Sequence, residues 1–271
     1  MTQKKNVVIV RGAGDISTGT IHRLWSAGYR VLALETLHPA AIRRQVALSE
    51  AVYQGRAAVE GAVAVRIESL EQAVAIWELN QIPLLVDPDG TCIEKMHPAV
   101  VVDAILAKRN LGTNKNMAPL TIGLGPGFVA GKDVHYVIET MRGHNLGRII
   151  AKGSAVPNTG VPGVIGGYAG ERVIHADAAG ELHVICDIGT KVTAGEKIAE
   201  IREISGTSVE VCTKISGIVR GMIREGYPVT KGFKIADVDP RIEELKNCYT
   251  ISDKARCIAG SVLELVCREE M

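Results

Sequence analysis

The chain has 271 residues, of which 46% are hydrophobic and 23% are charged, and its formal net charge is +1. These values are typical of a globular protein with one large domain or two to three small ones, and they exclude an intrinsically disordered chain. A net charge this close to zero gives no electrostatic basis for a nucleic-acid or membrane partner.

The sequence contains no recognisable targeting or metal-binding signal. No apolar run approaches the length that spans a membrane, and the first residues lack the apolar core of a signal peptide. The six cysteines are scattered without a CxxC spacing, which indicates free thiols rather than a disulfide framework or a zinc site. We therefore expect a cytoplasmic protein without a bound metal.

The first forty residues have the pattern of a strand, a helix and a second strand. The β-branched run Val7–Val10 predicts a buried parallel strand. Gly12-Ala13-Gly14 then turns the chain into a helix predicted over Ile16–Ala27, where apolar residues recur at helical spacing. We expect Asp15 or Ser17 to cap this helix.

Glu35 ends the second predicted strand, Tyr29–Leu34, about 20 residues after the glycine turn. This is the layout of a dinucleotide-binding βαβ unit, in which glycines admit a pyrophosphate and the acid bonds a ribose hydroxyl. Ser17 replaces the third glycine of that pattern, and Asp15 puts a negative charge where a phosphate would face the helix amides. These departures count against a nicotinamide cofactor and favour a turn that serves helix–strand packing alone.

Charged side chains also stand near the ends of later strands. A helix is predicted over Ala40–Ala51, and its Arg43 and Arg44 would meet a 2′-phosphate or another anion beside Glu35, or form a solvated helix face. Asp87 follows a predicted strand at the position where open α/β sheets bind ligands. The alternative for Asp87 is that it only begins a turn.

Strand and helix signals alternate through this half of the chain. Strands are predicted over Ala62–Ile67 and Ile82–Val86, and between them Ser69 and Gln72 resemble a capping box at the start of a helix. A further helix is predicted over Ala99–Asn110. The alternation predicts an α/β domain.

A glycine-rich loop follows the strand predicted over Leu120–Gly123. Four of the nine residues from Gly123 to Gly131 are glycine. Such a loop either adopts positive φ at several positions or lets a ligand lie against bare backbone. Gly125 and Gly127 are therefore candidate ligand-binding residues.

Arg142, His144 and Asn145 lie between glycines in the loop that follows the strand predicted over Val134–Glu139. Arg142 offers a planar fork for phosphate or carboxylate. His144 is of the residue type that exchanges a proton near neutral pH. The cluster predicts a pocket for an anion or a nucleotide.

An anion site is expected where these two loops meet, because parallel strands end at one edge of a sheet. The anionic group would lie between Gly125-Pro126-Gly127 and Arg142. The competing interpretation is that Arg142 pairs with Glu139 or Asp133 and only ties the loops together.

An internal repeat occupies the second half of the chain. Its copies span Gly180–Ile201 and Gly217–Val238, with glycines at the turns and β-branched residues between them. The repeat resembles the biotinyl/lipoyl-carrier family, a two-fold β-sandwich whose modified lysine sits between the halves. The connection Arg202–Ser208 contains no lysine. We therefore expect neither covalent biotin nor covalent lipoate.

Several motifs follow one another along nearly the whole chain: RGAGD, HPxxxRR, GLGPGF, IETMRGHNLGR, PNTGxPG and then the repeat. Their order resembles the selenium-dependent molybdenum hydroxylase accessory (YqeB-like) family, and the N-terminal part is similar to the xanthine dehydrogenase accessory proteins. The resemblance implies a maturation role with a molybdenum hydroxylase client. It also implies a small phosphate-bearing ligand such as the molybdenum cofactor, in the form of a molybdopterin dinucleotide, or a nucleotide. No catalytic residue carries over, and a homo-oligomer remains open.

The alternative function is an NAD(P)-dependent oxidoreductase that uses the N-terminal glycine turn. Under both functions the predicted fold is α/β, a Rossmann-like mainly parallel sheet followed by a small biotinyl/lipoyl-like β-sandwich and a C-terminal helix over Asp253–Arg268. The expected parts are residues 1–113, 114–175, 176–240 and 241–271. The candidate cofactor-binding residues are Gly12, Ala13, Gly14, Asp15, Glu35, Asp87, Gly125, Gly127, Arg142, His144 and Asn145.

Overall fold

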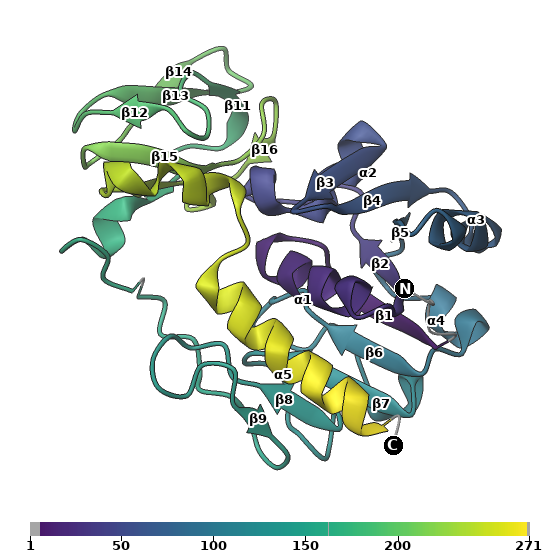
Figure 1. Ribbon diagram of the computed structural model, residues 1–271. Helices are drawn as coiled ribbons and strands as arrows, with labels where there is room; N and C mark the ends of the chain where they lie inside the picture. Colours follow the sequence, from purple (N-terminus) through teal and green to yellow (C-terminus); the bar gives the residue numbers. More distant parts are fainter. Residues whose placement is uncertain (1–5, 162, 270–271) are drawn as a thin grey trace. The chain divides into compact units, whose positions relative to one another are not determined.

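The chain folds into two compact units, each of which combines segments that are distant in the sequence (Figure 1). The computed structural model describes residues 6–161 and 163–269. Within them, the first unit contains the residues up to Pro39, then Ala47–Thr159, and then the residues from Ile251 onward. The second unit contains Ala40–Val46 and Gly160–Thr250.

The first unit is built on a mixed sheet that has nine strands in the described residues, in the order β3-β4-β5-β2-β1-β6-β7-β8-β9. Neighbouring strands from β4 to β8 run parallel, whereas β3 and β9 run antiparallel to β4 and β8. The strands are β1 Val7–Arg11, β2 Arg30–Glu35, β3 Arg56–Val59, β4 Ala62–Ile67, β5 Ile82–Val86, β6 Val100–Asp103, β7 Leu120–Leu124, β8 Tyr136–Ile138 and β9 Ile149–Ile150.

Helices of very different length accompany this sheet, and the two longest, α1 and α5, lie side by side (Figure 1). The α-helices are α1 Asp15–Ser26, α2 Ala51–Gln54, α3 Ala73–Glu78, α4 Cys92–Met96 and α5 Asp253–Glu269, and the 3-10 helices are η2 Leu48–Glu50, η3 Leu70–Gln72 and η4 Lys115–Met117. The capping box expected at the start of η3 is present. Among the described helices, none combines the length and apolar character needed to cross a membrane.

The close approach of α1 and α5 depends on a glycine in the contact. A Cβ added to Gly19 of α1 would lie 2.8 Å from the Cβ of Ala255 in α5 and 3.0 Å from its backbone. Gly260, also in α5, would meet nothing within 4 Å. Gly19 therefore serves packing, whereas Gly260 does not.

Alanine at these two glycines is expected to change stability in opposite directions. Gly19→Ala should lower the free energy of unfolding by about 1–2 kcal/mol, because the overpacking cost exceeds the gain in helix propensity. Gly260→Ala should raise it by about 0.5–1 kcal/mol, because only the propensity gain remains. Thermal unfolding followed by circular dichroism measures both. A gain in stability for both variants would contradict the packing role of Gly19.

The second unit consists of two antiparallel sheets of four strands each in its described residues, ordered β10-β17-β15-β12 and β14-β13-β11-β16. Their strands are β10 Val173–His175, β11 Gly180–Val184, β12 Lys191–Val192, β13 Lys197–Arg202, β14 Ser208–Cys212, β15 Gly217–Met222, β16 Pro228–Val229 and β17 Lys234–Asp239. The 3-10 helices η1 Arg44–Val46, η5 Gly170–Arg172 and η6 Ile242–Tyr249 complete the unit.

The two copies of the sequence repeat form equivalent strands that interlock. The first copy makes β11, β12 and β13, and the second makes β15, β16 and β17. The short middle strand of each copy pairs with the first strand of the other copy: β12 pairs with β15, and β16 pairs with β11. Gly180 and Gly217 start equivalent strands, and a Cβ at either would lie 2.3 Å or 2.2 Å from a backbone oxygen of the neighbouring strand. Only glycine fits at both positions.

The predicted fold class is wrong. The first sheet is a large mixed sheet, because the hairpin of β3 and β4 and the return of β9 beside β8 add antiparallel edges. The second unit is a pair of four-stranded antiparallel sheets that also takes in β10, β14 and the distant segment Ala40–Val46. The architecture is therefore not a Rossmann-like sheet followed by a biotinyl/lipoyl-like module.

Two predicted helices are also wrong, each for a local physical reason. The segment predicted as a helix over Ala99–Asn110 forms β6, because its β-branched valines pair between β1 and β7. The segment Ala40–Ala51 forms short 3-10 turns instead of one helix. The carbonyl of Ile42 accepts from the amide of Met222, and Nε of Arg44 donates to the carbonyl of Met222 at 2.7 Å. Hydrogen bonds to β15 thus replace helical ones.

Candidate functional site at the carboxyl edge of the mixed sheet

The carboxyl edge of the mixed sheet carries most of the predicted site residues. Gly12 follows β1, Glu35 ends β2, Asp87 follows β5, Gly125 follows β7 and Glu139 follows β8. Open α/β sheets bind ligands at this edge, because the loops that leave parallel strands converge there. We therefore take this edge as the candidate functional site.

The glycine turn after β1 is occupied by contacts within the protein. Gly12 has φ +95°, and a Cβ added there would lie 2.9 Å from the carbonyl oxygen of Ala104. The hydroxyl of Ser17 donates to the same oxygen at 2.8 Å. The amide of Ala13 donates to Oε1 of Glu35 at 2.9 Å. The strand order of the sheet reverses between β1 and β6. At this position the carbonyl of Ala104 and the carboxylate of Glu35 lie against the glycine turn.

The same contacts explain two departures from the dinucleotide pattern. Gly14 is the N-cap of α1, and no side chain caps this helix, so the expected cap by Asp15 or Ser17 is wrong. The hydroxyl of Ser17 is already used by the carbonyl of Ala104. Burial raises the pKa of Glu35, and hydrogen bonds from the amides of Ala13 and Thr36 act against this rise. The carboxylate of Glu35 thus accepts a hydrogen bond from the glycine turn, where the dinucleotide pattern would have it bond a ribose hydroxyl.

Asp87 holds the turn that begins α4. Its carboxylate accepts from the amide of Thr91 at 3.0 Å, the hydroxyl of Thr91 at 3.1 Å and the amide of Cys92 at 2.8 Å. Burial opposes the ionisation of Asp87, but the hydrogen bonds from Cys92 and Thr91 outweigh it and lower its pKa. These contacts support the turn interpretation over ligand binding.

Arg11 is a fully buried cation at this edge, and sequence reasoning missed its role. Its side chain is 1% exposed at the end of β1, and Nη1 lies 3.6 Å from Oδ2 of Asp103. Nη1 also donates to the hydroxyl of Thr113, and Nη2 donates to the carbonyl of Pro88 at 2.9 Å. A charged residue at the end of an otherwise apolar strand is the sequence signal for such a network.

The glycine-rich loop after β7 packs closely against other segments. Gly125 has φ +81°, its amide donates to the carbonyl of Ile138 at 2.9 Å, and a Cβ there would lie 2.6 Å from Oγ1 of Thr140. Gly127 has φ +115°, and a Cβ there would lie 2.7 Å from Cα of Arg109. Both glycines are therefore required by the fold at these points, and backbone or side-chain atoms already lie against them.

Arg142 meets an acid that the sequence analysis did not consider. Its Nη1 and Nη2 donate to the two carboxylate oxygens of Asp253, at 2.8 Å and 3.1 Å. Glu139 is buried and accepts from the amides of Met141 and Val156 instead. The side chain of Arg142 is 46% exposed, so the pair orients a guanidinium that still faces solvent. His144 and Asn145 in the same loop are exposed.

Lys254 is the second residue that sequence reasoning missed. It lies in the first turn of α5, is half-buried, and makes no hydrogen bond or ion pair with another described residue. Burial and the nearby charge of Arg142 lower its pKa, while Asp15, Glu139 and Asp253 act in the opposite direction. A lysine in the first turn of a helix opposes the helix dipole, and this unusual position is the signal that sequence reasoning had available.

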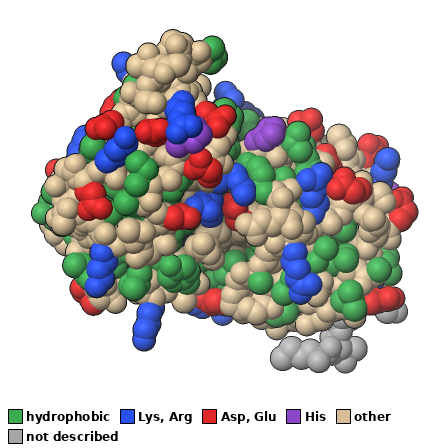
Figure 2. Space-filling view, turned by 90° about the horizontal axis from the view of Figure 1, so that it is seen from above, with side chains coloured by type: hydrophobic (Ala, Val, Ile, Leu, Met, Phe, Trp, Pro, Cys, Tyr) green, Lys and Arg blue, Asp and Glu red, His purple; other side chains and the backbone are tan. Residues whose placement is uncertain are grey.

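On the face of the molecule shown in Figure 2, acidic and basic side chains are interspersed and form no broad field of one sign. Within residues 6–161 and 163–269, no group of three or more His, Cys, Asp or Glu side chains could hold a metal ion.

Comparison with known proteins relates the chain to one protein over nearly its whole length. It is 48% identical over 258 residues to "Uncharacterized protein YqeB" of Escherichia coli (strain K12), a match that covers 95% of this chain and 47% of that protein. This match supports a YqeB-like family. The chain spans about half the length of this YqeB relative. No protein-family model matches the chain.

Solved structures resemble this chain only distantly. The ectoine utilization protein EutE (DoeB) of Ruegeria pomeroyi is 12% identical, with a TM-score of 0.29 and coverage of 88% of this chain and 86% of its own. A succinylglutamatedesuccinylase/aspartoacylase of Rhodobacter sphaeroides is 13% identical, with a TM-score of 0.29 and coverage of 89% and 87%. Scores this low assign neither the activity nor the fold of these proteins to this chain.

The comparisons do not support the predicted function. The names of these structures are those of desuccinylase, aspartoacylase and ectoine utilization proteins, and neither they nor the YqeB match mentions molybdenum, selenium or an oxidoreductase. The accessory role for molybdenum hydroxylases and the NAD(P)-dependent alternative are therefore not retained. The physical reason against the second is the glycine turn, where Ala104 and Glu35 stand in place of a pyrophosphate.

Proposed function

We propose that the first unit binds a small molecule with a phosphate group at the carboxyl edge of the mixed sheet, between Arg142 and Lys254. Arg142 stands on the loop after β8, and Asp253 already orients its planar guanidinium. Lys254 adds an ammonium group from the first turn of α5. Phosphate oxygens match both kinds of donor.

The observation that carries the proposal is that Lys254 is half-buried near the guanidinium of Arg142. Burial and a neighbouring guanidinium both disfavour its charged form, and no described residue accepts a hydrogen bond from it. Two like charges side by side are costly, and the carboxylates of Asp15, Glu139 and Asp253 offset only part of this cost, because the pKa of Lys254 remains lowered. A phosphate group there would accept from Lys254 and offset its repulsion with Arg142. Such perturbed groups cluster at functional sites.

Removal of either cation is expected to weaken binding of pyrophosphate, the probe used here, by about ten- to a hundredfold. A charge-assisted hydrogen bond contributes roughly 1.5–3 kcal/mol, which sets this range. Isothermal titration calorimetry would compare the wild type with Lys254→Met and Arg142→Gln. The control is Lys152→Met, which removes an exposed lysine of the same unit. Unchanged affinity in both site variants would refute the proposal.

Stability separates this role from a structural one. The pair of Arg142 and Asp253 is 46% and 73% exposed, and exposed pairs contribute about 0–1 kcal/mol. Arg142→Gln should therefore bind pyrophosphate weakly while its melting temperature stays close to that of the wild type. A large fall in melting temperature with unchanged affinity would show that Arg142 only ties the loop to α5.

Binding is also expected to take up protons. The pKa of Lys254 is lowered in the free protein, and a bound anion favours the charged amine, so the pKa rises on binding. Between these two pKa values the complex holds more protons than the free protein, and affinity falls as the pH rises through that range. Calorimetry in two buffers of different ionisation enthalpy measures the net uptake, which should be smaller in Lys254→Met, where only the protonation change of pyrophosphate itself remains.

A further inference from the structure

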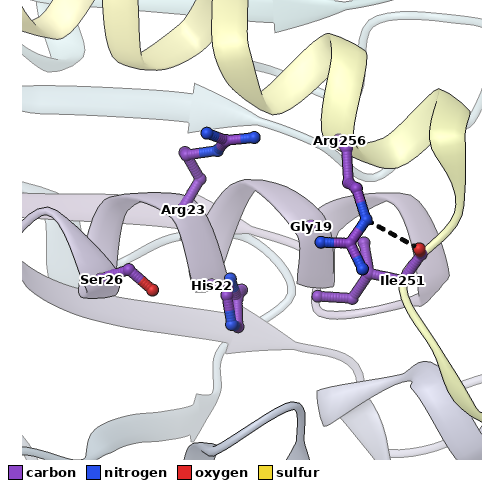
Figure 3. Close-up of a pocket in the computed structure, with 6 residues that line it drawn as sticks. All are labelled: Gly19, His22, Arg23, Ser26, Ile251 and Arg256. Atoms are coloured by element: carbon purple, nitrogen blue, oxygen red, sulfur yellow. Dashed lines mark hydrogen bonds between the residues drawn. The ribbon is translucent and has the colours of Figure 1, made fainter.

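A separate hollow lies on the first unit, beside α1 and the start of α5. It has a volume of about 190 Å³ and is lined by Gly19, His22, Arg23, Ser26, Ile251 and Arg256 (Figure 3). The four residues from α1 share one helix face, because they are spaced by three and four positions. Arg256 and Ile251 face them from the beginning of α5 and the residues before it.

Arg256 lines this hollow, and hydrogen bonds hold its side chain in place. Its Nε donates to the carbonyl of Ile251 at 3.2 Å, and its Nη2 lies 2.8 Å and 3.0 Å from the carboxylate oxygens of Glu60 (Figure 3 shows the first contact). Oε1 of Glu60 also accepts from the amide of Ile251 at 2.8 Å. Glu60 thus positions Arg256 and pairs with its charge.

Arg23 is the second arginine that lines the hollow. Its side chain is exposed, and it makes no hydrogen bond or ion pair with another residue in the described ranges. In Figure 3 it extends from α1 toward α5, on the side from which Arg256 enters. Nε2 of His22 donates to the carbonyl of Glu60 at 3.2 Å, so this ring is held by the protein.

We propose that this hollow is a second binding site of the first unit, for a small oxyanion group held by Arg23 and the hydroxyl of Ser26. The guanidinium of Arg23 offers a planar pair of donors, and the hydroxyl of Ser26 adds a neutral one. Gly19 lines the hollow with backbone alone, because a Cβ there would meet Ala255 of α5. The site is independent of Arg142 and Lys254, which do not line it.

Titration of the Lys254→Met protein with inorganic phosphate tests this site apart from the one at the carboxyl edge. The readout is the nuclear magnetic resonance signal of arginine Nε–H groups, with Arg23→Gln used for assignment. The Arg23 signal should shift with a saturating dependence on phosphate, whereas that of Arg268, an exposed arginine at the other end of α5, should not. Arg23→Gln should lower the affinity measured at the other hollow residues by about tenfold.

Two outcomes would overturn the inference. One is a shift at Arg23 that grows linearly without saturation and matches that of Arg268, which would mean ionic screening alone. The other is saturable binding that Arg23→Gln leaves unchanged. A parallel titration with acetate distinguishes a carboxylate from a phosphate ligand, because both offer oxyanion acceptors but differ in charge. Neither outcome depends on the binding of pyrophosphate by Arg142 and Lys254.

Discussion

Replacement of Arg11 by Met is expected to lower the free energy of unfolding by about 3–5 kcal/mol, because it breaks a buried ion pair by removing one partner. Arg11 and Asp103 are 1% and 2% exposed, and their charged atoms lie 3.6 Å apart. Methionine fills the space of the aliphatic part of the side chain but leaves the Asp103 carboxylate without its cation. The carbonyl of Pro88 also loses its donor at 2.9 Å. Urea unfolding followed by circular dichroism measures the change.

Two further variants identify the cause. Arg109→Met removes an exposed arginine of the same unit and should change stability by less than about 0.5 kcal/mol. Arg11→Met combined with Asp103→Asn removes both charges and should recover part of the loss, since a neutral amide at this position leaves no unpaired buried charge. If Arg11→Met alone stays within about 1 kcal/mol of the wild type, the network at the end of β1 does not stabilise the sheet.

Replacement of Arg172 by Met should have an effect of similar size on the second unit, again about 3–5 kcal/mol. Nη2 of Arg172 donates to the two carboxylate oxygens of Asp237, at 2.9 Å and 3.1 Å, and the two residues are 5% and 9% exposed. The pair joins η5 to β17. Without Arg172, the Asp237 carboxylate loses its main compensating charge inside the unit.

The pH dependence of this loss follows from Asp237. Burial raises the pKa of Asp237, and the charge of Arg172 opposes that rise. Removal of Arg172 raises the pKa further, so the carboxyl group of the variant becomes protonated at a higher pH. The stability difference from the wild type should therefore shrink as the pH falls through that pKa. A difference that grows toward acid pH in urea unfolding, or its persistence in the Asp237→Asn background, would contradict the pairing.

Elements defined by local pattern were predicted correctly from the sequence. Two strands, Ala62–Ile67 and Ile82–Val86, match β4 and β5, because short apolar runs bounded by turns specify them. The helix predicted to start at Asp253 forms α5, because its apolar face recurs at helical spacing. The repeat likewise marked equivalent strands in the second unit, because glycine is required at the same turns of both copies.

Only the tertiary structure decided which side chains meet and how the strands are arranged. Strand direction at the edges depends on how β3 and β9 fold back on their neighbours, which no local pattern encodes. The acid that Arg142 bonds, Asp253, lies more than a hundred residues away, and so does the half-buried amine of Lys254. The glycine turn after β1 was predicted from the sequence as a turn. Only the tertiary structure shows that Glu35 accepts a hydrogen bond from the amide of Ala13 in this turn. Sequence periodicity reports burial within one element, whereas these contacts depend on which elements pack together.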